Sequence, residues 1–140
     1  MDELSVVIPV YNESESLYKL HQALHDALDI VDVPWEIIYV DDGSTDDSVE
    51  ILASLAEADP EHSRVSALRR NFGQTAAIAA GIDNSQGEII VLMDADMQND
   101  PADIPMMLEK MTDGYDVVSG WRYQRKDTFI TRTLPSKVAN

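Results

Sequence analysis

Short runs of apolar, often β-branched residues alternate along the chain with longer segments in which apolar residues recur every three or four positions. The short runs predict β-strands and the longer segments predict amphipathic helices. The expected strands are residues 4–9, 36–40, 65–68, 88–93 and 117–119, and the expected helices are 14–31, 46–58, 74–84 and 103–113. In the first helix Leu17, Leu20, Leu24 and Leu28 share one face.

Alternating strands and helices predict an α/β fold with a mostly parallel sheet and helices on both faces, because parallel strands need crossover connections. The run 88–93 is nearly all apolar, which predicts a central strand buried on both faces. Ligands of such sheets bind beyond the carboxyl ends of the strands. Chemistry is therefore expected just after Pro9, Val40, Leu68, Met93 and Ser119.

Composition narrows the class of protein. A length of 140 residues suits one domain, and the absence of cysteine excludes disulfides and thiolate metal sites. The chain has neither an apolar run near the ~20 residues of a membrane span nor a basic leader, so we expect no membrane span and no signal peptide. With 26 acidic residues against 10 basic ones the formal net charge is -16, which argues against nucleic-acid binding.

The basic residues are unevenly placed, since half of them lie within residues 122–140. We expect residues 1–121 to form the folded part and 122–140 to be a basic tail. Within the tail Ile130, Leu134 and Val138 share a helical face, which Pro135 would interrupt.

Two carboxylates spaced i, i+2 follow the fourth expected strand, in Asp94-Ala95-Asp96. Extended backbone places both side chains on one side, where they repel each other unless a cation compensates. Oxygen ligands suit Mg²⁺ or Mn²⁺, which also bind substrate phosphates. Alone the pair is a weak signal, but its place after a buried strand favours a metal site.

Asp41 and Asp42 follow the second expected strand and precede a turn at Gly43 and a helix cap near Asp46. Capping does not require the two acids, and a carboxylate there can accept a hydrogen bond from a nucleotide base. The two interpretations are evenly balanced on this motif alone.

Other strand ends carry weaker signals. Tyr11 could stack on a base or ribose and Glu13 could bind a ribose hydroxyl, although a simple turn capped by Asn12 or Ser14 is favoured on spacing alone. Among the arginines after the third and fifth strands, Arg122 is a candidate diphosphate contact.

His21 and His25 have the i, i+4 spacing of helical metal ligands. The sequence offers no evident third ligand, so we predict that both are surface residues.

Taken together, the segments SVVIPVYNE (5–13), VDDGSTD (40–46) and DAD (94–96) resemble family 2 glycosyltransferases. The segments RNFGQ (70–74), MDADMQNDP (93–101) and VSGWR (118–122) are similar to those of polyprenyl-phosphate glycosyltransferases of the dolichol-phosphate mannosyltransferase type. The resemblance covers essentially the whole chain, and it is specific as a set although each motif alone is not.

The resemblance implies a GT-A fold and an inverting transfer of sugar from a UDP- or GDP-sugar to a polyprenyl phosphate, with Mg²⁺ or Mn²⁺ as cofactor. The implied catalytic residues are Asp94, Asp96 and Arg122, of which Asp94 and Asp96 hold the metal. The implied nucleotide-sugar-binding residues are Pro9, Tyr11, Glu13, Val40, Asp41, Asp42, Arg70, Asp94, Ala95, Asp96, Gln98 and Arg122.

Enzymes of this type are longer than this chain and work at the cytoplasmic face of the membrane. We therefore expect the second half of the domain, with much of the acceptor site, to be absent, and donor binding by this chain to be weak. The tail 122–140 would approach the membrane surface and its lipid phosphates. The sequence leaves the oligomeric state open, a homo-oligomer included.

Four alternatives compete with this interpretation. A response-regulator receiver needs paired acids after the first strand, and a haloacid-dehalogenase-type phosphatase needs Asp-x-Asp there, whereas here these motifs follow the second and fourth strands. A noncatalytic nucleotide-sugar-binding module, or a family 2 enzyme with a saccharide acceptor, fits the sequence as well.

Overall fold

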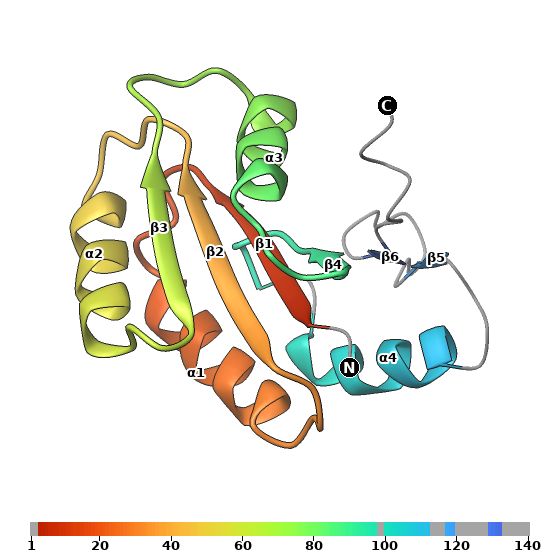
Figure 1. Cartoon of the computed structure of the whole chain (residues 1–140). Helices are drawn as coiled ribbons and strands as arrows, with labels where there is room; N and C mark the ends of the chain where they lie inside the picture. Colours follow the sequence, from red (N-terminus) through yellow and green to blue (C-terminus); the bar gives the residue numbers. More distant parts are fainter. Residues whose placement is uncertain (1–2, 98–99, 113–116, 120–128, 133–140) are drawn as a thin grey trace.

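A computed structural model describes residues 3–97, 100–112, 117–119 and 129–132. Six strands form one sheet in the order β3-β2-β1-β4-β6-β5 (Figure 1). The strands are β1 (Leu4–Val10), β2 (Trp35–Asp41), β3 (Ser63–Ala67), β4 (Ile89–Leu92), β5 (Val117–Ser119) and β6 (Phe129–Arg132). The strands β1 to β4 are parallel to one another, whereas β6 is antiparallel to both β4 and β5. The predicted α/β class with a mostly parallel sheet is confirmed.

Helices cover both faces of the sheet, as predicted. They are α1 (Leu17–Leu28), α2 (Ser48–Ala58), α3 (Gln74–Asp83) and α4 (Ile104–Thr112), the last preceded by the short 3₁₀ helix η1 (Pro101–Asp103). Figure 1 shows α1 and α2 on one face and α3 on the other. Among the described residues, no helix is both long and apolar enough to cross a bilayer.

The alternation of side chains along β1 divides the core into two layers. Val6 and Ile8 point toward the larger layer, which also contains Leu20 of α1 and Leu52 of α2. A smaller layer lies between the sheet and α3, where Ala77 packs against the sheet. Burial of both faces explains the continuous apolar runs of β1, β2 and β4.

A glycine sets the distance between α3 and the sheet. A Cβ on Gly81 would lie 2.4 Å from Cγ1 of Val7 and 3.2 Å from Cγ2 of Val40. Any larger residue at Gly81 would therefore push α3 away from β1 and β2, and with it the loop that precedes the helix.

The tail contains a strand that the sequence pattern did not predict. Ile130 lies in β6 and pairs with Val91 of β4, so the expected helical face is wrong at this residue. The strand pairs with β4, about forty positions away in the sequence, and periodicity within the tail carries no signal of such pairing. Leu134 and Val138 lie outside the described residues.

Candidate active site

A cleft of about 460 Å³ opens at the carboxyl ends of β1, β2 and β4. The order of the strands reverses between β1 and β4, and ligands of α/β sheets bind at such a reversal. The lining residues are Pro9, Val10, Tyr11, Glu13, Asp42, Asn71, Gly73, Gln74, Asp94, Ala95 and Asp96. The site is therefore made from four segments that lie far apart in the sequence.

The acidic pair lies where β4 ends. Met93 and Ala95 are buried. Asp94 and Asp96, which alternate with them, line the cleft, so both acids face one side as their spacing predicts. Ser16 donates a hydrogen bond from Oγ to the Ala95 carbonyl at 2.8 Å, which ties the pair to the start of α1.

Glu13 adds a third carboxylate to this corner of the cleft. Its pKa is raised by burial and then by the negative charges of Asp96, Asp94 and Asp46. A carboxylate crowded by other acids is stabilised by a bound cation, and oxygen donors of this kind suit Mg²⁺ or Mn²⁺. The residues present therefore fit the implied metal, because Asp94, Asp96 and Glu13 offer oxygen donors in one corner of the cleft.

One wall of the cleft is a loop that the Asp42 carboxylate holds in place. Its Oδ1 accepts a hydrogen bond from the Phe72 N–H at 2.8 Å, and its Oδ2 accepts from the Gly73 N–H at 3.0 Å. The Asn71 side-chain amide also donates to Oδ2, at 3.2 Å. Asp42 is only 3% exposed, so its oxygens serve the loop that leads into α3.

The neighbouring acid has a different environment. Asp41 is 1% exposed and its Oδ2 accepts a hydrogen bond from the Ser44 N–H at 2.9 Å. Its other oxygen, Oδ1, is buried without a hydrogen-bond partner among the described residues. Asp41, unlike Asp42, does not line the cleft, and its second oxygen is buried.

Asn12 joins the first two strand-end loops. Its φ of 54° lies in the left-handed region, and its Oδ1 accepts hydrogen bonds from the backbone N–H groups of Thr45 at 2.7 Å and Asp46 at 3.3 Å. Asn12, one of the two residues expected to cap the first helix, therefore binds the turn before α2 instead. Residues 13–16 form a turn instead, and α1 begins at Leu17.

The structure brings most of the expected site residues together in the cleft lining, namely Pro9, Tyr11, Glu13, Asp42, Asp94, Ala95 and Asp96. Val40 instead is fully buried and packs with Ala77 of α3. Arg70 is not among the lining residues, and its guanidinium lies 4.4 Å from the centroid of the Phe72 ring. Gln98 and Arg122 lie outside the described residues.

Asn71, Gly73 and Gln74 all line the cleft but were not among the expected site residues. Gln74 donates a hydrogen bond from Nε2 to Asp94 Oδ1 at 2.9 Å. The only signal for these residues was their place in the segment 70–74, which contributed to the family resemblance as a set.

The expectation that His21 and His25 are surface residues is wrong. Their side chains are 12% and 25% exposed and both face the Asp59 carboxylate. Asp59 follows α2 and lies 34 positions after His25, so helical spacing alone could not find it.

The sheet order, the cleft at its reversal and the carboxylates that line the cleft define an α/β domain of the nucleotide-binding class. The profile of Glycosyl transferase family 2 matches residues 5–138, and the chain belongs to this family. The resemblance seen in the sequence is thereby confirmed.

Curated relatives match the whole chain. It is 43% identical over 140 residues to an undecaprenyl-phosphate 4-deoxy-4-formamido-L-arabinose transferase of Sodalis glossinidius, and 44% identical over 140 residues to the transferase of that name from Pseudomonas aeruginosa. The match covers 100% of this chain but 43% and 41% of those proteins. The chain thus spans less than half the length of these relatives.

Solved structures confirm the GT-A fold. A mannosyltransferase from Pyrobaculum calidifontis, in complex with GDP-Man and Mn²⁺, superposes with a TM-score of 0.78 at 18% identity, over 92% of this chain and 44% of that one. TarS of S. aureus in complex with UDP-GlcNAc gives a TM-score of 0.75 at 20% identity, over 98% of this chain and 47% of that one.

Proposed function

We propose that this chain forms the donor-binding part of an inverting glycosyltransferase that moves a sugar from a UDP- or GDP-sugar to a polyprenyl phosphate. The observation that carries the proposal is the convergence of Asp94, Asp96 and Glu13 in one cleft where the strand order reverses. An acidic cleft repels a diphosphate on its own, so a bound divalent cation is the condition under which this donor fits.

The roles of the side chains follow from their positions. Asp94 and Asp96 would hold Mg²⁺ or Mn²⁺, which neutralises charge on the departing nucleoside diphosphate. Gln74 orients Asp94, and Ser16 fixes the backbone between the two acids. Tyr11, which is 46% exposed at the cleft, stacks on the base or ribose.

In this proposal, Asp41 or Asp42 supplies the carboxylate that accepts a hydrogen bond from the base. Asp42 is the member of the pair that lines the cleft, and its Oδ1, which accepts one hydrogen bond from Phe72, can accept a second from the base. Arg122 and Gln98 contact the diphospho-sugar in this proposal, and Arg70 lies near the cleft.

The reaction forms a bond between a phosphate oxygen of the acceptor and the anomeric carbon of the sugar as the bond to the nucleoside diphosphate breaks. A phosphate nucleophile is already anionic near neutral pH, so the residues need to position it rather than deprotonate it. The described carboxylates of the cleft therefore need not include a general base.

The names of the relatives supply the finer assignment. We propose 4-deoxy-4-formamido-L-arabinose as the sugar and undecaprenyl phosphate as the acceptor, since relatives 43% and 44% identical carry both in their names. Such an acceptor places the whole protein at the cytoplasmic face of the membrane, with the basic segment 122–140 toward lipid phosphates.

Calorimetric titration tests the donor site. UDP, GDP, UDP-glucose and GDP-mannose are titrated into the chain with and without Mn²⁺. We expect binding that requires Mn²⁺ and prefers one base. Binding of equal strength without Mn²⁺ would contradict the assigned metal, and absence of binding by every nucleotide in the presence of Mn²⁺ would contradict the donor site.

A further inference from the structure

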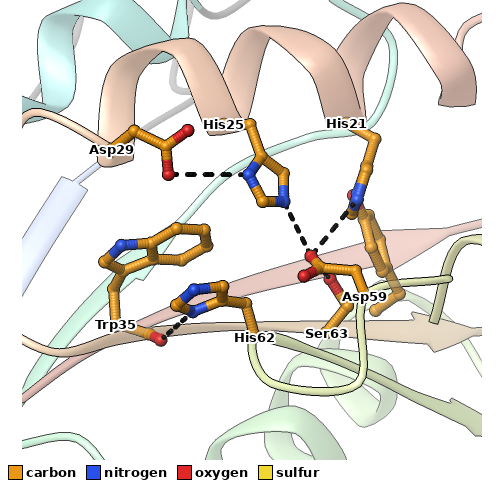
Figure 2. A network of polar contacts seen from close by, with 8 residues as sticks. His21, His25, Asp29, Trp35, Asp59, His62 and Ser63 are labelled. Carbon is orange, nitrogen blue, oxygen red and sulfur yellow. Dashed lines mark hydrogen bonds and ion pairs between the residues drawn. The ribbon is translucent and has the colours of Figure 1, made fainter. Parts of the chain in front are cut away.

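A second cluster of metal-ligating side chains lies away from the cleft (Figure 2). His21 and His25 project from neighbouring turns of α1, and Asp59 meets them from the end of α2. His25 Nε2 lies 2.7 Å and His21 Nε2 lies 3.5 Å from the same carboxylate oxygen, Asp59 Oδ2. One ligand atom from each residue lies within 4.8 Å of the other two.

The second ring nitrogen of each histidine, Nδ1, also lies close to a polar partner. Nδ1 of His21 lies at hydrogen-bond distance, 2.7 Å, from the Tyr39 hydroxyl, and Nδ1 of His25 lies 3.6 Å from Asp29 Oδ1. A partner at hydrogen-bond distance orients the ring of a metal-ligating histidine and leaves Nε2 to the ion, whereas the longer Asp29 contact is an ion-pair distance. The two histidines are therefore suitable metal ligands both in residue type and in the orientation of their rings.

The Asp59 carboxylate is also oriented by a hydrogen bond. Ser63 donates a hydrogen bond from Oγ to Asp59 Oδ2 at 2.7 Å, and the side chain of Asp59 is 16% exposed. Figure 2 shows Asp59 between the helix that carries the two histidines and the strand that begins at Ser63. All three candidate ligands are therefore partly buried.

The two distances from the histidine nitrogens to the Asp59 oxygen fit a small ion after a modest movement. Ligand atoms about 2.0–2.1 Å from a tetrahedral zinc lie about 3.3 Å from one another. The 3.5 Å between His21 Nε2 and Asp59 Oδ2 already matches this separation. The 2.7 Å between His25 Nε2 and Asp59 Oδ2 must widen by about half an ångström, a change that side-chain rotation provides.

We propose that His21, His25 and Asp59 bind one Zn²⁺ ion through two imidazole nitrogens and a carboxylate oxygen, with water completing the coordination. Two imidazoles favour zinc over Mg²⁺, which prefers oxygen ligands. The ion joins α1 to the turn between α2 and β3. It lies near Ser63, at the amino end of β3, whereas the donor cleft opens at the carboxyl ends of β1, β2 and β4.

Calorimetric titration with ZnCl₂, in a buffer with excess Mg²⁺ to occupy the acidic cleft, tests this site. Wild type is expected to bind one zinc ion per chain. H25Q and D59N are expected to lose at least tenfold in affinity, and D29N to lose about tenfold through its effect on His25. The matched control is H62Q, because the His62 ring lies 5.9 Å from that of His25 but its Nδ1 contacts the Trp35 carbonyl.

Two further measurements separate a zinc site from adventitious binding or misfolding. Circular dichroism verifies that each variant is folded, and thermal unfolding with and without zinc is expected to show stabilisation of wild type and H62Q but not of D59N. D96N tests the acidic cleft and should keep the high-affinity zinc. Equal zinc affinity of wild type and D59N, or loss of the ion in D96N alone, would overturn the proposal.

Discussion

The side-chain amide of Gln74 donates a hydrogen bond to Asp94 Oδ1 at 2.9 Å and so links the first residue of α3 to the end of β4. The two residues lie 20 positions apart and both line the cleft. A partner that fixes the orientation of a ligating carboxylate commonly contributes to metal affinity. The bond thus couples the position of α3 to the geometry of the acidic pair.

Removing this partner should weaken metal binding without unfolding the protein. We expect Q74A to lower the affinity for Mn²⁺ by about tenfold, as measured by calorimetry, because Asp94 loses its fixed orientation. The matched control is Q22A, which removes the hydrogen bond from exposed Gln22 to Asp26 on α1, at 3.0 Å. Equal Mn²⁺ affinity of Q74A and Q22A would show that orientation of Asp94 does not matter.

Asp96 is expected to be essential for metal-dependent donor binding. D96A should abolish the Mn²⁺-dependent part of UDP or GDP binding, while the far-ultraviolet circular dichroism stays unchanged because Asp96 is not part of the core. As a control, D83A removes an exposed carboxylate at the end of α3, outside the cleft lining. Nucleotide affinity that is unchanged in D96A would count against the assigned site.

Gly43 and Gly73 offer a matched pair for the stability of the loop that walls the cleft. Both have a positive φ, 76° and 106°, and Gly73, with a ψ of 158°, lies in a region that essentially only glycine adopts, so alanine costs about 1–3 kcal/mol of backbone strain at either position. A Cβ on Gly43 would also lie 2.4 Å from the Arg70 carbonyl carbon and from the Asn71 nitrogen, whereas nothing lies within 4 Å of a Cβ on Gly73.

We therefore expect G43A to destabilise the protein by about 1–3 kcal/mol more than G73A, since the added methyl group must displace backbone. Urea unfolding followed by circular dichroism measures the difference. If the two variants have the same free energy of unfolding, the close approach of the two loops is not a constraint in solution.

The carboxylate of Asp46 should make stability depend on pH. Its Oδ1 accepts a hydrogen bond from the Ser48 N–H at 2.9 Å, and its Oδ2 accepts from the Ser14 N–H at 3.3 Å. Burial opposes ionisation, but these hydrogen bonds outweigh it and lower the pKa below the ordinary value of 3.8. The unfolded state then binds more protons, so the stabilisation is present above that value and is lost as pH falls through the native pKa.

At pH 7 the free energy of unfolding of D46N is expected to be about 1 kcal/mol lower than that of wild type. One carboxylate oxygen that accepts a hydrogen bond from a backbone N–H is replaced by an amino group, which cannot accept it. The difference from wild type should shrink as the pH falls below 3.8. D47N is the control, since the Asp47 side chain makes no cap hydrogen bond. A difference for D46N that stays constant down to low pH would contradict the assignment.

The order and type of most elements followed from the sequence alone. The periodicity of apolar residues acts over a few positions, and it located β1 to β5 and α1 to α4 to within a few residues. The spacing of Asp94 and Asp96 likewise determined that both acids face one side, because side chains alternate in extended backbone. Local geometry dictates both results, so both could be predicted.

Tertiary structure alone decided the remaining features. Two of these features are hydrogen bonds, from the loop before α3 to Asp42 and from Gln74 to Asp94. The others are the pairing of β6 with β4 and the contact of the α1 histidines with Asp59. Each joins groups about 20 or more positions apart. Such contacts depend on which strands pair and which helix faces meet, and no periodicity within one segment carries that information.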